Sequence, residues 1–174
     1  MLLQGRPLGR SSSYNVSGRV IIANQSLVLQ RVTRNSAGNY TCVGSNEEGD
    51  GVSNPFYLNV MYPPTCRPNQ ARVHGVAKKE MARVTCSVDA NPTDVQFRWS
   101  FNNSAEVSQV DREHISRQGL VSHVTYTPVS EMDYGSLLCY ASNKIGSQTV
   151  PCVFHIIAAG LYFSSCLDSI RNPK

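Results

Sequence analysis

The chain has 174 residues, of which 41% are hydrophobic and 16% charged, and its net charge is +4. This composition is typical of a folded protein and excludes an intrinsically disordered one. The positive charge is spread along the chain without a dense run of lysine or arginine, so we expect no nucleic-acid partner. Six cysteines point to an oxidising compartment, in which disulfides persist.

The N-terminal region has no recognisable structural pattern. Residues 1–18 are rich in Gly, Ser and Arg and predict no regular structure. Gln4, Gly5 and Arg6 interrupt any apolar core, so the first residues do not form a secretory signal. No run of eighteen apolar residues occurs, and we expect no membrane-spanning segment. Extracellular chemistry without a targeting segment suggests that the chain is a piece of a larger product.

Strand signals follow up to residue 61. Residues 19–22 and 26–32 have the composition of strands, and a further run ends at Cys42. Residues 50–61 predict the last strand of this region. The next residues include two prolines, Pro63 and Pro64, which mark a domain junction. Because proline fixes φ, we expect this join to be short and stiff.

After the junction, a cysteine, a tryptophan and a second cysteine lie on three alternating runs. They are Cys86, Trp99 and Cys139, and the second cysteine follows the first by 53 residues. In an immunoglobulin sandwich such a disulfide crosses between two sheets, and the indole packs on it. The sequence therefore predicts an all-β, immunoglobulin-like β-sandwich over residues 62–158.

An internal repeat relates the two regions at a constant offset of 97 residues. The matching positions are Leu27 and Val124, Leu29 and Tyr126, Val32 and Val129, Gly38 and Gly135, and Cys42 and Cys139. At this offset the counterpart of Cys86 falls before residue 1. The counterpart of Trp99 is Leu2, which has no strand pattern around it. We therefore expect residues 1–61 to be a truncated immunoglobulin-like domain without its first two strands, and residues 159–174 to be an unstructured or aberrant tail.

Two further cysteines, Cys66 and Cys152, fall in the first and last predicted strands of the complete domain. These strands can run side by side near one edge of a sandwich, so a second disulfide between them is favoured over two free cysteines. Closing a loop of this length stabilises by roughly 4 kcal/mol in the chain-entropy model. With Cys86 paired to Cys139, we expect Cys42 and Cys166 to be unpaired.

Catalytic and metal-binding patterns are not found in the sequence. No Cys-x-x-Cys or His-Glu-x-x-His spacing occurs, and neither does a nucleophile elbow, a pair of acids or a phosphate loop. The histidines are scattered, at His74, His114, His123 and His155. We expect His123 to face solvent and His155 to be half-buried. Asp133 precedes a glycine and is interpreted as a turn acid. We predict no enzyme activity, no metal or other cofactor, and no small-molecule substrate.

Four Asn-x-Ser/Thr sequons make glycosylation candidates of Asn15, Asn24, Asn39 and Asn102. Asn102 is favoured because it begins a predicted turn between strands.

A tyrosine two residues before the sixth-strand cysteine hydrogen-bonds back across a corner in many such sandwiches. Tyr40 fills this position in the first domain, whereas Leu137 fills it in the second. We therefore expect the bond to be missing in the second domain, where the added disulfide offsets the loss.

Several strings resemble the sidestep family of arthropod cell-surface proteins. The resemblance covers about residues 19–160 and rests on residues 26–42 (SLVLQRVTRNSAGNYTC), 60–68 (VMYPPTCRP), 97–103 (FRWSFNN), 131–135 (EMDYG) and 151–160 (PCVFHIIAAG). It implies a membrane-anchored, extracellular protein with several immunoglobulin domains and a fibronectin type III domain. Such proteins guide motor axons and are recognised by beaten path receptors of the immunoglobulin superfamily. The segment after Gly160 does not resemble a fibronectin domain.

Two functional hypotheses follow from the sequence. A third, an enzyme or a metal protein, is the least favoured. The first is a non-enzymatic recognition or adhesion module, a fragment of an axon-guidance protein similar to sidestep, which binds a beaten path-like receptor at the cell surface. The alternative is a structural spacer or soluble decoy without direct partner binding. It stays open because membrane-distal domains usually make the partner contact in such families.

Overall fold

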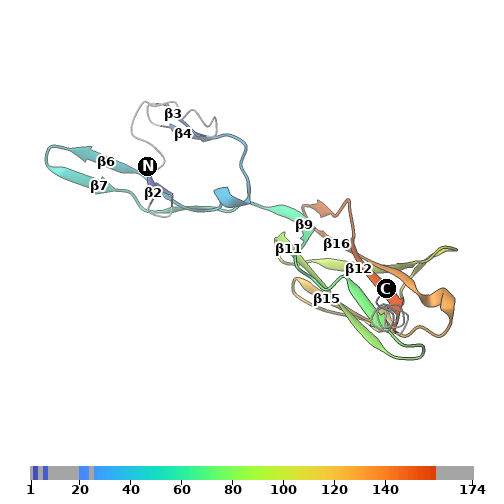
Figure 1. The fold of residues 1–174 in the computed structure, drawn as a ribbon. Coiled ribbons are helices and arrows are strands. Elements are labelled where there is room, and N and C mark those ends of the chain that lie inside the picture. Colours follow the sequence, from blue (N-terminus) through green and yellow to red (C-terminus); the bar gives the residue numbers. More distant parts are fainter. Residues whose placement is uncertain (1, 4–5, 8–19, 24–25, 160–174) are drawn as a thin grey trace, which may run out of the picture. The chain divides into compact units, whose positions relative to one another are not determined.

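The regular structure of the chain consists of strands and short 3-10 turns over the residues that its computed structural model describes, 2–3, 6–7, 20–23 and 26–159. The all-β class predicted from the sequence is therefore confirmed. No helix among these residues is long and apolar enough to cross a membrane. The chain divides into two units, residues 1–61 (unit 1) and residues 62–174 (unit 2), which are drawn in Figure 1.

Unit 2 is a sandwich of two sheets. The four-stranded sheet has the order β14–β15–β11–β9, with bounds Ile115–Gln118, Val121–Tyr126, Ala82–Asn91 and Tyr62–Cys66. The six-stranded sheet has the order β10–β18–β16–β12–β13, with bounds Val73–Val76, Cys152–Ala158, Gly135–Asn143, Gln96–Asn102 and Val107–Gln109. The short β17, Gly146–Ser147, pairs with β16. The β10–β18 pair is parallel, and the other pairs are antiparallel. Two 3-10 turns, η2 (Arg112–His114) and η3 (Glu131–Asp133), precede β14 and β16.

The core of unit 2 follows from period-two alternation. In β11, Val84, Cys86 and Val88 are fully buried while the residues between them are more exposed. Trp99 and Leu137 face them from the other sheet and are also fully buried. Each such apolar side chain contributes roughly 1.5–3 kcal/mol on burial, so the two inner faces hold the sandwich together.

The two prolines predicted to form a stiff junction lie instead inside β9. This strand pairs with β11 on one side only. A proline has no N–H to donate, and an edge strand does not need one on its free side. Pro64 is fully buried. The Pro-Pro pair is therefore part of the first strand of unit 2 rather than a linker before it.

Unit 1 contains three separate groups of paired strands. A four-stranded sheet has the order β2–β1–β5–β8, with bounds Arg6–Pro7, Leu2–Leu3, Gly38–Thr41 and Phe56–Leu58. Two hairpins are formed by β3 and β4, Val20–Ala23 and Ser26–Leu29, and by β6 and β7, Val43–Asn46 and Gly49–Val52. The 3-10 turn η1, Arg34–Ser36, precedes β5.

The expectation of no regular structure in residues 1–18 is wrong for β1 and β2. Leu2 pairs with Thr41 of β5, close to the register in which Trp99 of β12 pairs with Cys139 of β16. Backbone pairing does not require an alternating sequence, which is why two leucines without a strand pattern still extend the sheet. Among the described residues of unit 1, no strand takes the place of β9, β10 or β11.

The repeat slips by one residue in the last strand. Gly38 pairs with Leu58 in unit 1, whereas Gly135 pairs with Ile156 in unit 2, so the offset there is one residue larger. A one-residue shift moves a side chain to the opposite face of a sheet. His155, predicted to be half-buried from its match to Leu58, is therefore exposed, while Phe154 and Ile156 are buried.

Candidate functional site

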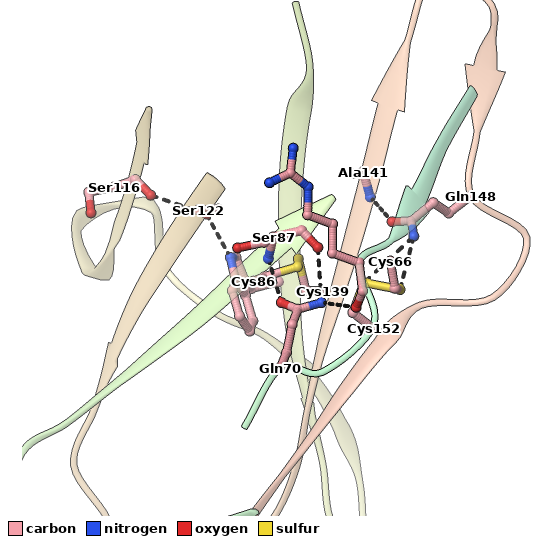
Figure 2. Close-up of a disulfide and its surroundings, with 12 residues drawn as sticks. Cys66, Gln70, Cys86, Ser87, Ser116, Ser122, Cys139, Ala141, Gln148 and Cys152 are labelled. Carbon is pink, nitrogen blue, oxygen red and sulfur yellow. Dashed lines mark hydrogen bonds between the residues drawn. A yellow bond between two sulfur atoms is a disulfide. The ribbon is translucent and has the colours of Figure 1, made fainter. Parts of the chain in front are cut away.

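Two disulfides cross unit 2 next to each other, as Figure 2 shows. Cys86 of β11 is bonded to Cys139 of β16, and their Cα atoms are 6.5 Å apart. Cys66 of β9 is bonded to Cys152 of β18 with a Cα separation of 5.7 Å. The expectation that these two strands run side by side is wrong, because β9 and β18 belong to opposite sheets. Both bonds therefore join one sheet to the other.

The indole of Trp99 is fixed by a polar contact that the sequence analysis missed. Its Nε1–H donates to the hydroxyl of Ser122 at 3.0 Å, and this hydroxyl donates to the carbonyl of Ser116 at 3.1 Å. Trp99 and Ser122 are both fully buried. Ser122 shares the inward parity of Val124 on β15, which is the signal that could have identified it. The ring of Phe154 lies against the indole, with 5.7 Å between centroids.

The corner hydrogen bond expected to be missing from unit 2 is made by a different tyrosine. In unit 1, Tyr40 donates to the carbonyl of Ser36 at 2.6 Å. In unit 2, Tyr126 donates to the carbonyl of Asp133 at 2.9 Å. Asp133 is the repeat counterpart of Ser36. The carbonyl at this position therefore accepts a tyrosine hydroxyl in both units, but in unit 2 the tyrosine comes from β15. The Tyr126 ring also stacks on Phe101 at 5.1 Å.

Asp133 holds the turn that leads into β16. One of its carboxylate oxygens, Oδ2, accepts hydrogen bonds from the backbone N–H of Ser130 at 2.7 Å and of Val129 at 2.9 Å. These two bonds hold the pKa of the Asp133 carboxyl below its usual range. Burial and the neighbouring Asp133 charge raise the pKa of Tyr126 to about 12. Both groups therefore act in the turn, Asp133 as an acceptor and Tyr126 as a donor.

The histidines do not gather into a site. His74 donates its Nε2–H to the Ala71 carbonyl, His123 is hydrogen-bonded to Thr85, and His155 is hydrogen-bonded to Ser136. His114 lies beside Glu113 at 3.5 Å. In the part of the chain that the structure describes, no three His, Cys, Asp or Glu side chains are grouped so as to hold a metal ion.

The remaining candidate positions are distributed between the two units. Asn39 is exposed on β5, and Asn102 is exposed at the end of β12, immediately before the turn to β13. Cys42 is free and exposed. Asn15, Asn24 and Cys166, as well as residues 160–174 of the predicted tail, lie outside the described residues.

The outer face of the six-stranded sheet carries a mixed surface in register across its strands. One row of paired residues consists of Val107, Asn102, Ser136, His155 and Val73. A second row consists of Gln109, Ser100, Leu138 and Val153. In a third, the guanidinium of Arg98 lies 4.9 Å from the ring centre of Tyr140. We call this surface, Arg98 and Tyr140 with the two rows, the outer face.

The outer face leaves apolar side chains in contact with solvent at both of its ends. Val107 on β13 is 67% exposed and Val73 on β10 is 58% exposed. Leu138 and Val153 are half-buried between them. The remaining side chains of the two rows carry hydroxyl, amide and imidazole groups, and Arg98 is the one charged residue of the outer face. The surface thus mixes apolar and polar side chains, as protein interfaces do.

Comparison with known proteins supports the immunoglobulin-like fold of unit 2. Residues 63–143 match the immunoglobulin domain family. The chain is 27% identical over 120 residues to the limbic system-associated membrane protein of Gallus gallus, covering 69% of this chain. It is 28% identical over 173 residues to neural cell adhesion molecule 1 of Gallus gallus, covering 93% of this chain. Unit 2 therefore has an immunoglobulin-like fold, and the proteins to which the chain is similar include a neural cell adhesion molecule.

The chain spans 34% and 15% of the lengths of these two relatives, so it corresponds to only part of each. Among solved structures, an E-to-A variant of titin domains I67–I69 matches 91% of this chain and 53% of its own, with a TM-score of 0.50 and 21% identity. This match supports the fold alone.

Proposed function

We propose that unit 2 is a non-enzymatic recognition module of a cell-surface adhesion protein, and that it binds another immunoglobulin-superfamily protein through its outer face. The observation that carries the proposal is the solvent-exposed pair Val107 and Val73, which flank the polar residues of one row on a single sheet. Relatives named as a membrane protein and as a cell adhesion molecule support the same class of function.

The chemistry of the outer face suits a protein partner. Arg and Tyr are enriched where interfaces concentrate their binding energy, and Arg98 and Tyr140 already stack on each other. Tyr140 is therefore presented as a preordered side chain. Charged residues are depleted at the centre of interfaces, and Leu138 and Val153 occupy the centre here.

The finer assignment rests on the resemblance to the sidestep family. Within it, the chain is a fragment of an axon-guidance ectodomain, and its partner is a beaten path-like receptor. Disulfides in unit 2 fit an extracellular location. Exposure of Asn39 and Asn102 leaves both sequons accessible to glycosylation. Because Asn102 lies in the outer face, binding through this face requires Asn102 to be unmodified.

A binding assay with matched variants tests the proposal. The full chain is displayed on a surface and titrated with immunoglobulin-superfamily ectodomains, beaten path receptors included. In V73E/V107E, two exposed apolar residues of the outer face become acidic. The control M81E/V150E makes the same change at side chains that are 70% and 72% exposed but lie outside both rows. We expect the first variant to weaken binding by about tenfold or more and the control to be almost neutral.

The spacer hypothesis is favoured by one observation, the pair of disulfides that joins the two sheets and stiffens unit 2. If no ectodomain binds the unmodified chain, recognition by this unit is wrong and the spacer role stands. If both variants weaken binding equally, the outer face is not the contact surface.

A further inference from the structure

A second surface of unit 2 lies on the opposite sheet, where the segment after β9 runs along the edge of β11. An open hollow of about 400 Å³ is lined there by residues 67–71, by His74 and by the outward side chains of β11. The polar groups that line it are Arg67, Asn69, Gln70, His74, Arg83 and Thr85. Pro68, Ala71 and Ser87 complete the lining. The hollow is therefore formed mainly by hydrogen-bonding side chains.

The charge in this hollow is uncompensated. Arg67 and Arg83 both line it, whereas no aspartate or glutamate does. The larger hollow of unit 2, about 640 Å³, is lined by Glu106, Asp111 and Asp133 and has the opposite character. Neither arginine has an ion-pair partner within residues 28–159, whose side chains the structure describes.

The neighbouring His123 responds to this positive charge. Burial, and then repulsion from Arg83, lower the pKa of the His123 imidazole. His123 is held next to Thr85, with 2.9 Å between Nδ1 and Oγ1. Arg83 therefore lies close enough to His123 for its positive charge to act on the imidazole, and no carboxylate lines the hollow to neutralise that charge.

The backbone that presents Arg67 is fixed by Gln70. The Gln70 side-chain amide donates to the carbonyls of Arg67 at 2.8 Å and Ser87 at 2.9 Å, and accepts from the Ser87 N–H at 2.6 Å. Figure 2 shows Gln70 and Ser87 in this arrangement. The Arg67 N–H also donates to the Ser87 carbonyl at 3.0 Å. The amide of Gln70 thereby pairs with β11 as a neighbouring strand would, so the wall of the hollow is preorganised.

We propose that this hollow binds sulfate groups of a sulfated polysaccharide. A guanidinium donates two parallel hydrogen bonds to an oxyanion, and two arginines beside one hollow offer four such donors. The Asn69 amide and the Thr85 and Ser87 hydroxyls supply neutral partners for sugar hydroxyls. The disulfides indicate an oxidising, extracellular setting, in which sulfated polysaccharides are the abundant oxyanion polymers. This site goes beyond the proposed protein recognition and lies on the other sheet.

Heparin oligosaccharides are the probe, measured by calorimetry on the full chain at near-physiological salt. The test variant is R67Q/R83Q. The control, K78Q/K144Q, removes the same charge from exposed positions outside the hollow. We expect the test variant to bind about tenfold or more weakly, since charge-assisted hydrogen bonds are lost, and the control to change by less than about threefold. Thermal unfolding of each variant checks that the fold is retained.

The chemistry of the ligand is tested with two further probes. Chemically desulfated heparin should not compete, and a phosphopeptide should compete only weakly. No binding by the unmodified chain, or equal losses in both variants, would overturn the site. Strong competition by the phosphopeptide would overturn the assignment to a polysaccharide. R67Q/R83Q leaves the outer face unchanged and should still bind the protein partner. The polysaccharide site and the protein-binding face can therefore be disproved independently of each other.

Discussion

Unit 1 and unit 2 use the same turns but differ in what those turns enclose. A capping box spans Thr33 and Ser36 in η1, and another spans Ser130 and Asp133 in η3, at the repeat offset. Yet among the described side chains of unit 1 only one apolar residue, Tyr40, is buried, whereas unit 2 has a continuous core. Turn geometry is thus specified locally, but burial requires strands from both sheets.

The hairpin turns that contain Gly49 and Gly146 are also closed in the same way in both units. The side-chain oxygen of Asn46 accepts from the N–H of Glu48 and Gly49, and that of Asn143 accepts from Ile145 and Gly146. Each asparagine closes its own turn with its side-chain oxygen. The amide of Asn143 also donates to the carbonyls of Tyr62 and Pro92, which ties the second hairpin to the rest of unit 2. The turn-closing contacts persist in unit 1 although Phe56, in its last strand, is 67% exposed.

The largest expected difference between the units is in resistance to proteolysis. β4 has a free edge among the described residues, and unit 1 buries little apolar surface. We expect limited trypsin or chymotrypsin digestion to remove residues 1–61 while residues 62–158 remain intact, as followed by mass spectrometry. Equal protection of the two units would contradict the comparison.

Replacing Trp99 by alanine should remove a central part of the buried core that distinguishes unit 2 from unit 1. We expect a loss of about 3–5 kcal/mol in the free energy of unfolding, because a large cavity opens and Ser122 loses its indole donor. Denaturant melts measure the loss. A change below about 1 kcal/mol would show that the side chain is not part of the core.

Removing the Cys66–Cys152 disulfide tests whether the second link between sheets accounts for the stability of unit 2. The variant C66A/C152A opens a loop of 86 residues, and we expect a loss of about 2–4 kcal/mol by thermal unfolding. The Gln148 amide, which lies 3.2 Å from the Cys66 sulfur, would lose this contact as well. Unchanged stability would mean that the core alone determines it.

Exchanging the corner residues should convert the turn of unit 2 into that of unit 1. Tyr126 and Leu137 occupy the repeat positions of Leu29 and Tyr40. We expect Y126L and L137Y each to destabilise by about 1–3 kcal/mol, the first by losing a hydrogen bond and the second by overpacking a buried site.

The double variant Y126L/L137Y should recover part of that loss, because the tyrosine introduced at position 137 can then reach the Asp133 carbonyl. Denaturant melts of all four proteins give the coupling energy. Additive losses would show that the two positions do not serve the same bond.

The smallest effect concerns pH. The folded pKa of Asp133 is lowered, so its contribution to stability is present above the unfolded value of 3.8 and disappears as pH falls through the lower folded pKa. We expect the stability difference between the unmodified chain and D133N to shrink over this acidic range. E131Q, in the same turn and exposed, is the control and should show no such change. A pH-independent difference for D133N would exclude a role for the Asp133 charge.

The sequence predicts those parts of the fold that depend on period and spacing. Alternation identifies the strands that carry Cys86, Trp99 and Cys139, and the parity of β15 would have placed Ser122 inside. Contacts between residues far apart in the chain are not predicted. Phe154 of β18 lies against Trp99 of β12, and Gln70 completes an edge of β11.

The internal repeat gives a wrong prediction of burial where the strand register differs between the two units. It places His155 on the wrong face because a single-residue shift in β18 is invisible in the matching cysteines upstream. The outer face has the same limit: its rows are aligned by strand register, which the sequence does not contain explicitly. The hollow beside Arg67 is not anticipated either, since its wall is a side-chain amide rather than a strand.

The position of Cys66 and Cys152 has a mechanical consequence. They lie in the first and last strands of unit 2, so tension applied at the two ends of the unit passes from one to the other through the sulfur–sulfur bond. The chain between them, a sequence separation of 86, carries no load, and roughly 300 Å of extended chain cannot be pulled out for as long as the bond is intact. Under stretching, unit 2 would lengthen little, and a reductant rather than force would release its stored contour length.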